Sequence, residues 1–188
     1  MRMTESALRQ LIRETLLTEA MVTPEAAAKM GLAFELNNDG RYIDVVATGH
    51  AGSGSVSAKL IDNGHMRIWS VESSRVELSG LGPLLYDLLM DAAHPDPITS
   101  DRSAVSTSAK RVWDYYLNSR PDIEAIQLDN PDDFLTPQPD DNFSQQSAMN
   151  LDGFEGWPQS SLSKAYRRKD DRTPTLLALW NLDVLNMS

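Results

Sequence analysis

The chain has 188 residues, no cysteine and a formal net charge of −10. This length suggests one domain with extensions, and the lack of cysteine excludes disulfides, thiolate metal sites and cysteine nucleophiles. The negative charge argues against a nucleic-acid partner, because phosphate contacts need a local excess of Lys and Arg. No apolar run approaches the roughly 18 residues that indicate a membrane span, and the three histidines lack metal-ligand spacing.

Residues 4–20 have the spacing of an amphipathic helix, with apolar side chains recurring on one face. The segment ends in Leu17-Thr18-Glu19-Ala20. It resembles the capsid-targeting leaders of large tailed phages, which are short amphipathic helices ending in a Leu/Ile-x-Glu protease site. The resemblance implies cleavage between Glu19 and Ala20, and a phage capsid or other virion protein as partner. A plain N-terminal helix packed on its own domain remains the alternative.

Four strand-like segments follow a short helix that starts at Thr23-Pro24-Glu25. They form two predicted hairpins, because Asn37–Gly40 and Asp62–Gly64 are strong turn signals. The strand-like segments are 32–36, 41–48, 56–61 and 65–71. Gly49–Gly54 could cradle a phosphate, but we favour a flexible connection between strands, because no helix pattern follows it.

A glycine turn, Gly80-Leu81-Gly82-Pro83, comes after the fourth strand and opens directly into a helix. Five leucines from Leu81 to Leu89 recur at the spacing of one buried helix face. Such a turn leaves backbone N–H groups free at the positive end of the helix, which favours phosphate. Next come a predicted short strand at 97–100, a helix at 106–118 and a final strand at 124–128.

The order strand, Gly-x-Gly turn, helix, short strand and Ala-x-x-aliphatic-aromatic helix resembles the core of the GNAT acyltransferases. In that family the turn binds the pyrophosphate of acetyl-CoA, and its pattern is Gln/Arg-x-x-Gly-x-Gly/Ala. Here Glu77 stands at the first position. A tyrosine of the second helix protonates the leaving thiolate in the family. Trp113 occupies that position in this chain, with Tyr115 and Tyr116 close by.

The resemblance implies an α+β fold with a mixed, mostly antiparallel sheet flanked by helices, over residues 23–128 and after an N-terminal segment at 1–22. It implies acetyl-CoA as cofactor. The implied cofactor-binding residues are Ser70, Val71, Ser79, Gly80, Leu81, Gly82, Pro83 and Leu84. In catalysis, Glu72 or Glu77 would take a proton from the acceptor amine, and Tyr116 or Tyr115 would return one to the thiolate. Asp101 and Arg102 could orient substrate, although we favour a local ion pair.

Residues 129–188 are expected to lie outside this domain. Residues 129–141 are rich in Asp and Pro and read as a solvated linker. The apolar tail that follows should dock on its own domain or on a neighbour, with a helix over 175–185. The basic run Tyr166–Lys169 is expected to be a solvated loop between helices.

Three functions remain open from the sequence. The first is an acyl-CoA-dependent N-acetyltransferase, phage-encoded if the leader is genuine, that acts on a small-molecule or protein amine. The second is a catalytically inactive GNAT-like structural or internal virion protein, which Glu77 and Trp113 favour. The third is a binding module in which Gly80 and Gly82 only form a tight turn. The corresponding locations are the host cytoplasm or the virion.

Overall fold

The computed structural model describes residues 21–62, 66–128, 156 and 159–188. Within them, the helices are α2 (Pro24–Lys29), α3 (Leu81–Ala93), α4 (Thr107–Ser119) and α6 (Pro174–Asn181), with a 3₁₀ turn at Ser161–Ser163. The strands are β1 (Ala33–Asn38), β2 (Tyr42–Gly49), β3 (Gly52–Asp62), β4 (Arg67–Val76), β5 (Ile98–Thr99), β6 (Ile123–Gln127), β7 (Lys164–Arg168) and β8 (Leu185–Met187). None of the described helices is long and apolar enough to cross a membrane.

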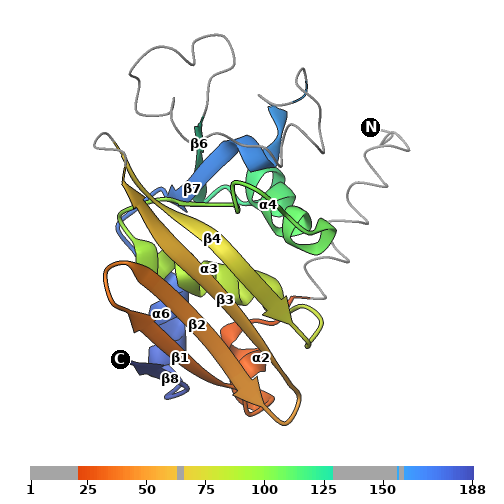
Figure 1. The fold of residues 1–188 in the computed structure, drawn as a ribbon. Helices are drawn as coiled ribbons and strands as arrows, with labels where there is room; N and C mark the ends of the chain where they lie inside the picture. Colours follow the sequence, from red (N-terminus) through yellow and green to blue (C-terminus); the bar gives the residue numbers. More distant parts are fainter. Residues whose placement is uncertain (1–20, 63–65, 129–155, 157–158) are drawn as a thin grey trace, which may run out of the picture.

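The strands form one mixed sheet in the order β6-β7-β5-β4-β3-β2-β1-β8 (Figure 1). Strands β1 to β4 are antiparallel neighbours, and β6 and β5 pair antiparallel with β7. Only the β4–β5 and β1–β8 pairs are parallel. The predicted α+β class with a mixed, mostly antiparallel sheet and flanking helices is therefore confirmed, and both predicted hairpins form.

The sheet extends beyond the strand that was predicted to be the last. β7 lies between β5 and β6, and β8 pairs with β1. The predicted solvated loop at Tyr166–Lys169 is wrong, because Tyr166 and Arg168 of β7 are buried. The predicted helix over 175–185 stops at Asn181, since the chain turns there and enters β8. The leader-like segment and the acidic linker lie outside the described residues.

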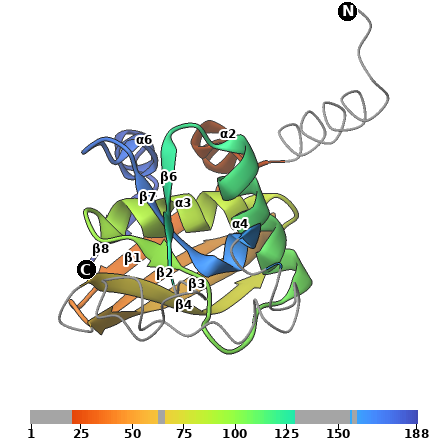
Figure 2. The ribbon, with the colours of Figure 1, turned by 90° about the horizontal axis from the view of Figure 1, so that it is seen from above.

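Helices α2, α3 and α6 lie on one face of strands β1 to β4 (Figure 2). Alternate residues of these strands are buried beneath them, as the two-residue period of a strand requires. α3 crosses β2 and β3, and it approaches β3 closely at Gly54. A Cβ at Gly54 would lie 2.9 Å from Leu85 Cδ1 and 3.1 Å from Leu81 Cδ2. Residues 49–54, which we predict to be a flexible connection, therefore contribute Gly54 to β3. The lack of a side chain at Gly54 allows α3 to pack closely against this strand.

Strand β4 has one partner along its whole length and another along only a small part. It pairs with β3 from Arg67 to Val76, with one extra residue, Glu72, where the register shifts. On its other side it pairs with β5 only at Trp69 and Ser70. Beyond Ser70 the part of the chain that the structure describes places no strand against this edge of β4. The sheet therefore opens on one side of β4, beside α3 and α4.

A network of buried charges ties the C-terminal elements to α3. Arg168 of β7 donates to Asp91 of α3 through Nε at 2.8 Å and to Asp122 through Nη1 at 2.7 Å. The second Asp91 oxygen accepts the backbone N–H groups of Thr175 and Leu176, at 2.7 and 3.0 Å. Asp91 therefore caps the first turn of α6 from a different helix and pairs with a buried cation at the same time.

Candidate functional site

The N-terminus of α3 presents unpaired backbone donors. Gly80 adopts φ +81°, a left-handed conformation suited to glycine, and provides no side-chain cap. The Leu81 N–H is used, because it donates to the Leu78 carbonyl at 3.2 Å, and Pro83 has no N–H. Among the described residues, nothing accepts a hydrogen bond from the Gly80 or Gly82 amides. Two free donors at a positive helix end favour an anion.

Gly80 and Gly82 line a cavity of about 450 Å³, which we call the outer cavity. The turn side of this cavity includes Glu77, Ser79, Gly80, Gly82 and Pro83. The opposite side comes from α4. Within the described residues, the turn predicted to bind a diphosphate therefore lines a cavity.

Charges of both signs lie at the outer cavity. Arg111, an exposed residue of α4, lines this cavity and is a cation that the sequence alone did not single out. Glu77 is the acid that would oppose an anion. Its carboxylate accepts the Ser53 hydroxyl at 2.6 Å and pairs with Arg75 Nη2 at 3.2 Å. Because Arg75 balances Glu77 locally, the repulsion of an anion at the turn is weakened.

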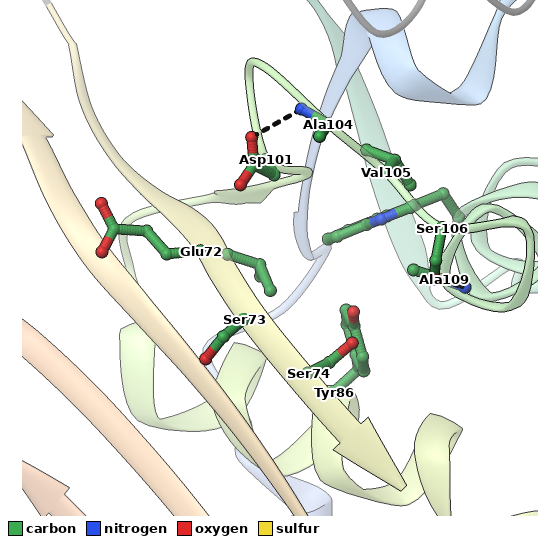
Figure 3. A pocket seen from close by; sticks show the side chains of 11 residues that line it. Glu72, Ser73, Ser74, Tyr86, Asp101, Ala104, Val105, Ser106 and Ala109 are labelled. Carbon is green, nitrogen blue, oxygen red and sulfur yellow. Dashed lines mark hydrogen bonds between the residues drawn. The ribbon is translucent and has the colours of Figure 1, made fainter.

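A second cavity of about 260 Å³, the inner cavity, lies beside the unpaired part of β4 (Figure 3). Val71 and Glu72 of β4 line it, together with Asp101, Val105 and Trp113. Glu72 is the extra residue of the β4 bulge, and bulges of this kind change the direction of a side chain near functional sites. The predicted catalytic acid Glu72 and the predicted cofactor contact Val71 therefore both line the inner cavity, but Glu72 is exposed and its carboxylate points away from the other lining side chains (Figure 3).

Ser74, Tyr86 and Ala109 line both cavities, so the two cavities are neighbours with these residues between them. Tyr86 is only 2% exposed, and burial raises the pKa of its hydroxyl, an effect that a hydrogen bond with Ser74 partly offsets. Sequence reasoning missed Tyr86. The available signal was its spacing, because Gly82 and Tyr86 are four residues apart and share one face of α3.

The three aromatic residues singled out on α4 have different surroundings. Tyr115 lines the outer cavity, and Trp113 lines the inner one. Tyr116 lines neither: its hydroxyl donates to Asp87 Oδ1 at 2.8 Å, and Arg120 Nη1 holds the same carboxylate at 2.9 Å. Burial and the Asp87 charge raise the pKa of Tyr116 well above its usual value. The structure thus brings Tyr115, but not Tyr116, to a cavity.

Other predicted site residues serve the fold. The side chains of Leu81 and Leu84 belong to the core, and the Ser70 hydroxyl donates to the Ser100 carbonyl at 3.4 Å. The favoured ion pair between Asp101 and Arg102 is wrong. Asp101 Oδ1 accepts the backbone N–H groups of residues 103 and 104, and Arg102 Nη1 donates to Thr99 Oγ1 at 3.1 Å.

No family model, curated protein or solved structure matches this chain. Among the described residues there is also no group of three or more His, Asp or Glu side chains able to hold a metal ion. The chemistry of the site therefore has to be inferred from the two cavities, their unpaired amides and their ionisable side chains.

Proposed function

We propose that this protein is a GNAT-like N-acetyltransferase that transfers an acetyl group from acetyl-CoA to an amine. The observation that carries the proposal is the pair of neighbouring cavities along the unpaired edge of β4, with Gly80 and Gly82 in the lining of the outer one. One cavity suits a long anionic donor, and the other suits the reacting groups.

The outer cavity fits the diphosphate end of such a donor. The Gly80 and Gly82 N–H groups supply two donors, and the positive end of α3 adds a favourable field. Arg111 supplies the opposing cation. When bound, acetyl-CoA supplies an activated acyl group as a thioester. Pre-oriented donors of this kind stabilise negative charge best where water is excluded.

The inner cavity fits the acceptor amine and the reacting carbonyl. Glu72 lines this cavity, and we assign it the proton of the attacking ammonium group through bridging water, because its carboxylate points away from the other lining side chains (Figure 3). Asp101 adds a second negative charge to the lining, and none of the described residues that line this cavity is a Lys or Arg. The electrostatics favour a cationic acceptor, which would also deliver its amine next to the base.

Isothermal titration of the full chain with acetyl-CoA tests the proposal. Saturable binding at micromolar concentrations is expected, and replacement of Arg111 by Gln should weaken it because the diphosphate loses a cation. Arg41→Gln is the matched control, since Arg41 is exposed and does not line the cavity. No heat of binding up to millimolar acetyl-CoA would rule the transferase out.

The second candidate is an inactive structural or internal virion protein, and Trp113 at the position of the usual tyrosine favours it. Glu77 also favoured an inactive protein, but this argument is weaker because the Glu77 carboxylate is paired with Arg75. Mass spectrometry of phage particles distinguishes the two functions. A mature N-terminus at Ala20 in virions would support packaging, and absence of the protein from particles would exclude a virion protein.

A further inference from the structure

We infer that this protein forms a symmetric dimer through strand β8, which pairs antiparallel with β8 of a second copy. The inference goes beyond the proposed function, because it concerns a different part of the sheet. In the strand order, β1, β2 and β3 separate β8 from β4 and its unpaired edge (Figure 1). No residue of β8 lines the outer or the inner cavity, so either proposal can fail without the other.

The outer edge of β8 carries backbone groups that no described strand uses. The Val184 carbonyl accepts a hydrogen bond from β1 at 2.7 Å, and the Ser188 N–H donates one to β1 at 3.0 Å. Successive residues of a strand direct their backbone groups to opposite sides, so those of Leu185 and Met187 point to the open edge. β8 also has none of the charged side chains or prolines that protect exposed edges from pairing.

These outward backbone groups are self-complementary. When two copies meet across a two-fold axis at Asn186, Leu185 of each copy lies opposite Met187 of the other. Each such pair exchanges N–H···O bonds in both directions, and this register uses both outward residues of each copy. The axis is normal to the sheet, so α6 of both copies lies on the same face.

The helix that lies over this end of the sheet has an exposed apolar face. Leu177 and Trp180 of α6 are 51% and 53% exposed, although Leu179 of the same helix is buried in the core. Leu182, directly after α6, and Met187 of β8 are exposed as well. A helix that is apolar on both faces is normally covered on both. A second copy that adds its β8 and α6 here provides that cover.

A cavity of about 370 Å³ is lined by Trp180 and by all three residues of β8. In an antiparallel pair, residues that lie directly opposite share one face of the sheet. Met187 of the second copy therefore lies beside Leu185, at this cavity. Methionine fills irregular apolar spaces and makes favourable contacts with aromatic rings, so its side chain suits a space beside Trp180.

Charge favours this surface for contact between two copies. The chain has a formal net charge of −10, so two copies repel one another at most orientations. Asp183 is the only charged residue in the sequence from Thr173 to Ser188. The surface formed by α6 and β8 can therefore be brought together in two copies with little repulsion.

The exposed apolar area is close to what a stable dimer needs. A fully exposed large side chain presents about 200 Å², so the half-exposed side chains of α6, Leu182 and Met187 contribute about 400 Å² per copy. Two copies together bury about 800 Å² from these side chains alone, and the β8 backbone brings the total near the roughly 1,000 Å² of specific interfaces.

Cysteine trapping tests the pairing directly, because the chain has no cysteine of its own. Asn186→Cys places two thiols across the axis at a Cα separation of about 4.5 Å, which a disulfide can span. Mild oxidation of the full chain should give a covalent dimer of twice 20.9 kDa. Glu35→Cys is the matched control and should not cross-link, because Glu35 lies opposite Asn186 on β1, one strand farther from the axis.

Analytical ultracentrifugation of the full chain measures the dimer without a cross-link. We expect a Kd of about 1–100 µM, the weak end of the range for interfaces of modest area. Met187→Lys and Trp180→Lys should each raise this Kd about tenfold or more, because each puts a charge into the apolar contact. The control Tyr42→Lys changes an exposed aromatic residue of β2 and should leave the Kd within about twofold.

Amide hydrogen exchange identifies what covers the edge of β8. Protection of the Leu185 and Met187 amides that increases with protein concentration would support the dimer. A chain that remains monomeric at about 100 µM would overturn it. Protection that is independent of concentration would also overturn it, since a segment of the same chain would then cover β8. A dimer that tolerates both lysine substitutions and gives no Asn186→Cys cross-link would exclude this interface.

Discussion

Two residues of the same type can differ greatly in what the fold requires of them. Gly80 needs its glycine for a left-handed φ, whereas Gly82 has ordinary helical geometry and room for a side chain. Arg167 and Arg168 are adjacent in β7, yet only Arg168 is buried within a charge network. Such pairs allow a substitution and its control to be chosen in the same element.

Gly82→Ala should stabilise the fold and weaken cofactor binding together. The new methyl group would lie 3.9 Å from Val76 Cγ2, an ordinary contact, and alanine favours a helix over glycine by about 0.5–1 kcal/mol. The same methyl group would occupy space in the lining of the outer cavity beside the proposed diphosphate. We expect a higher Tm in calorimetry and a roughly tenfold weaker Kd for acetyl-CoA, about the value of one charge-assisted hydrogen bond. Unchanged affinity would remove Gly82 from the proposed diphosphate site.

Arg168→Met should be strongly destabilising. It leaves Asp91 buried without its cation, a loss of about 3–5 kcal/mol. Arg167→Met breaks the exposed pair with Glu124 and should cost less than about 1 kcal/mol. Urea denaturation of both variants provides the comparison. Similar losses in the two would show that the buried network does not stabilise the fold as described.

At the scale of elements, the position of α3 determines the candidate site. Its first turn presents the free amides, its second carries Tyr86, and its third carries the buried charges that hold β7 and α6. Gly54 allows this helix to lie close to β3. A displacement of α3 should therefore alter stability and cofactor binding together.

Gly54→Val tests this coupling. Its side chain would collide with Leu81 and Leu85, and overpacking of this kind costs about 1–3 kcal/mol. The shift of α3 should also weaken acetyl-CoA binding, although Gly54 itself lines neither cavity. Ser55→Val, the next residue on the opposite face of β3, is the control and should change neither quantity much. Loss of stability with intact affinity would mean that the turn keeps its geometry independently of the packing beneath α3.

At the scale of the whole molecule, the chain's C-terminal elements extend the sheet at both ends. β8 flanks β1 at one end of the sheet, and β7 joins β6 to β5 at the other. The charges that stabilise the end at β7 include Asp122, whose pKa is lowered to about 2 by its bond to Arg120. Stability should therefore depend on acid pH through this carboxylate.

The direction of this pH effect on stability follows from the difference between the pKa of Asp122 in the folded and in the unfolded state. A carboxylate with a depressed folded-state pKa stabilises the fold above its ordinary pKa of about 4, and that contribution is lost as the pH falls toward 2. Asp122→Asn should thus be less stable than wild type at pH 6, with the difference shrinking between pH 4 and pH 2. Urea titrations across this range measure it. The control Asp170→Asn affects an exposed pair with Arg172 and should show little difference at any pH. If the stability difference between Asp122→Asn and wild type stayed the same from pH 6 to pH 2, the lowered pKa of Asp122 would be contradicted.

Local sequence determined the hairpins and the two long helices. The turn signals at Asn37–Gly40 and Asp62–Gly64 predicted which strands pair, and the leucine spacing after Gly80 predicted a buried helix face, because turn chemistry and periodicity act within a few residues. The glycine turn and the bulge residue Glu72 also became part of the candidate site.

Only the tertiary structure decided which distant segments meet. β8 pairs with β1 in the register Phe34 to Leu185, and β7 brings Arg168 beneath α3. Strand pairing joins residues far apart in sequence, so no local pattern encodes it. The family resemblance implied Tyr116 as an acid. The packing instead binds its hydroxyl to Asp87 and leaves Tyr86 in the lining of both cavities.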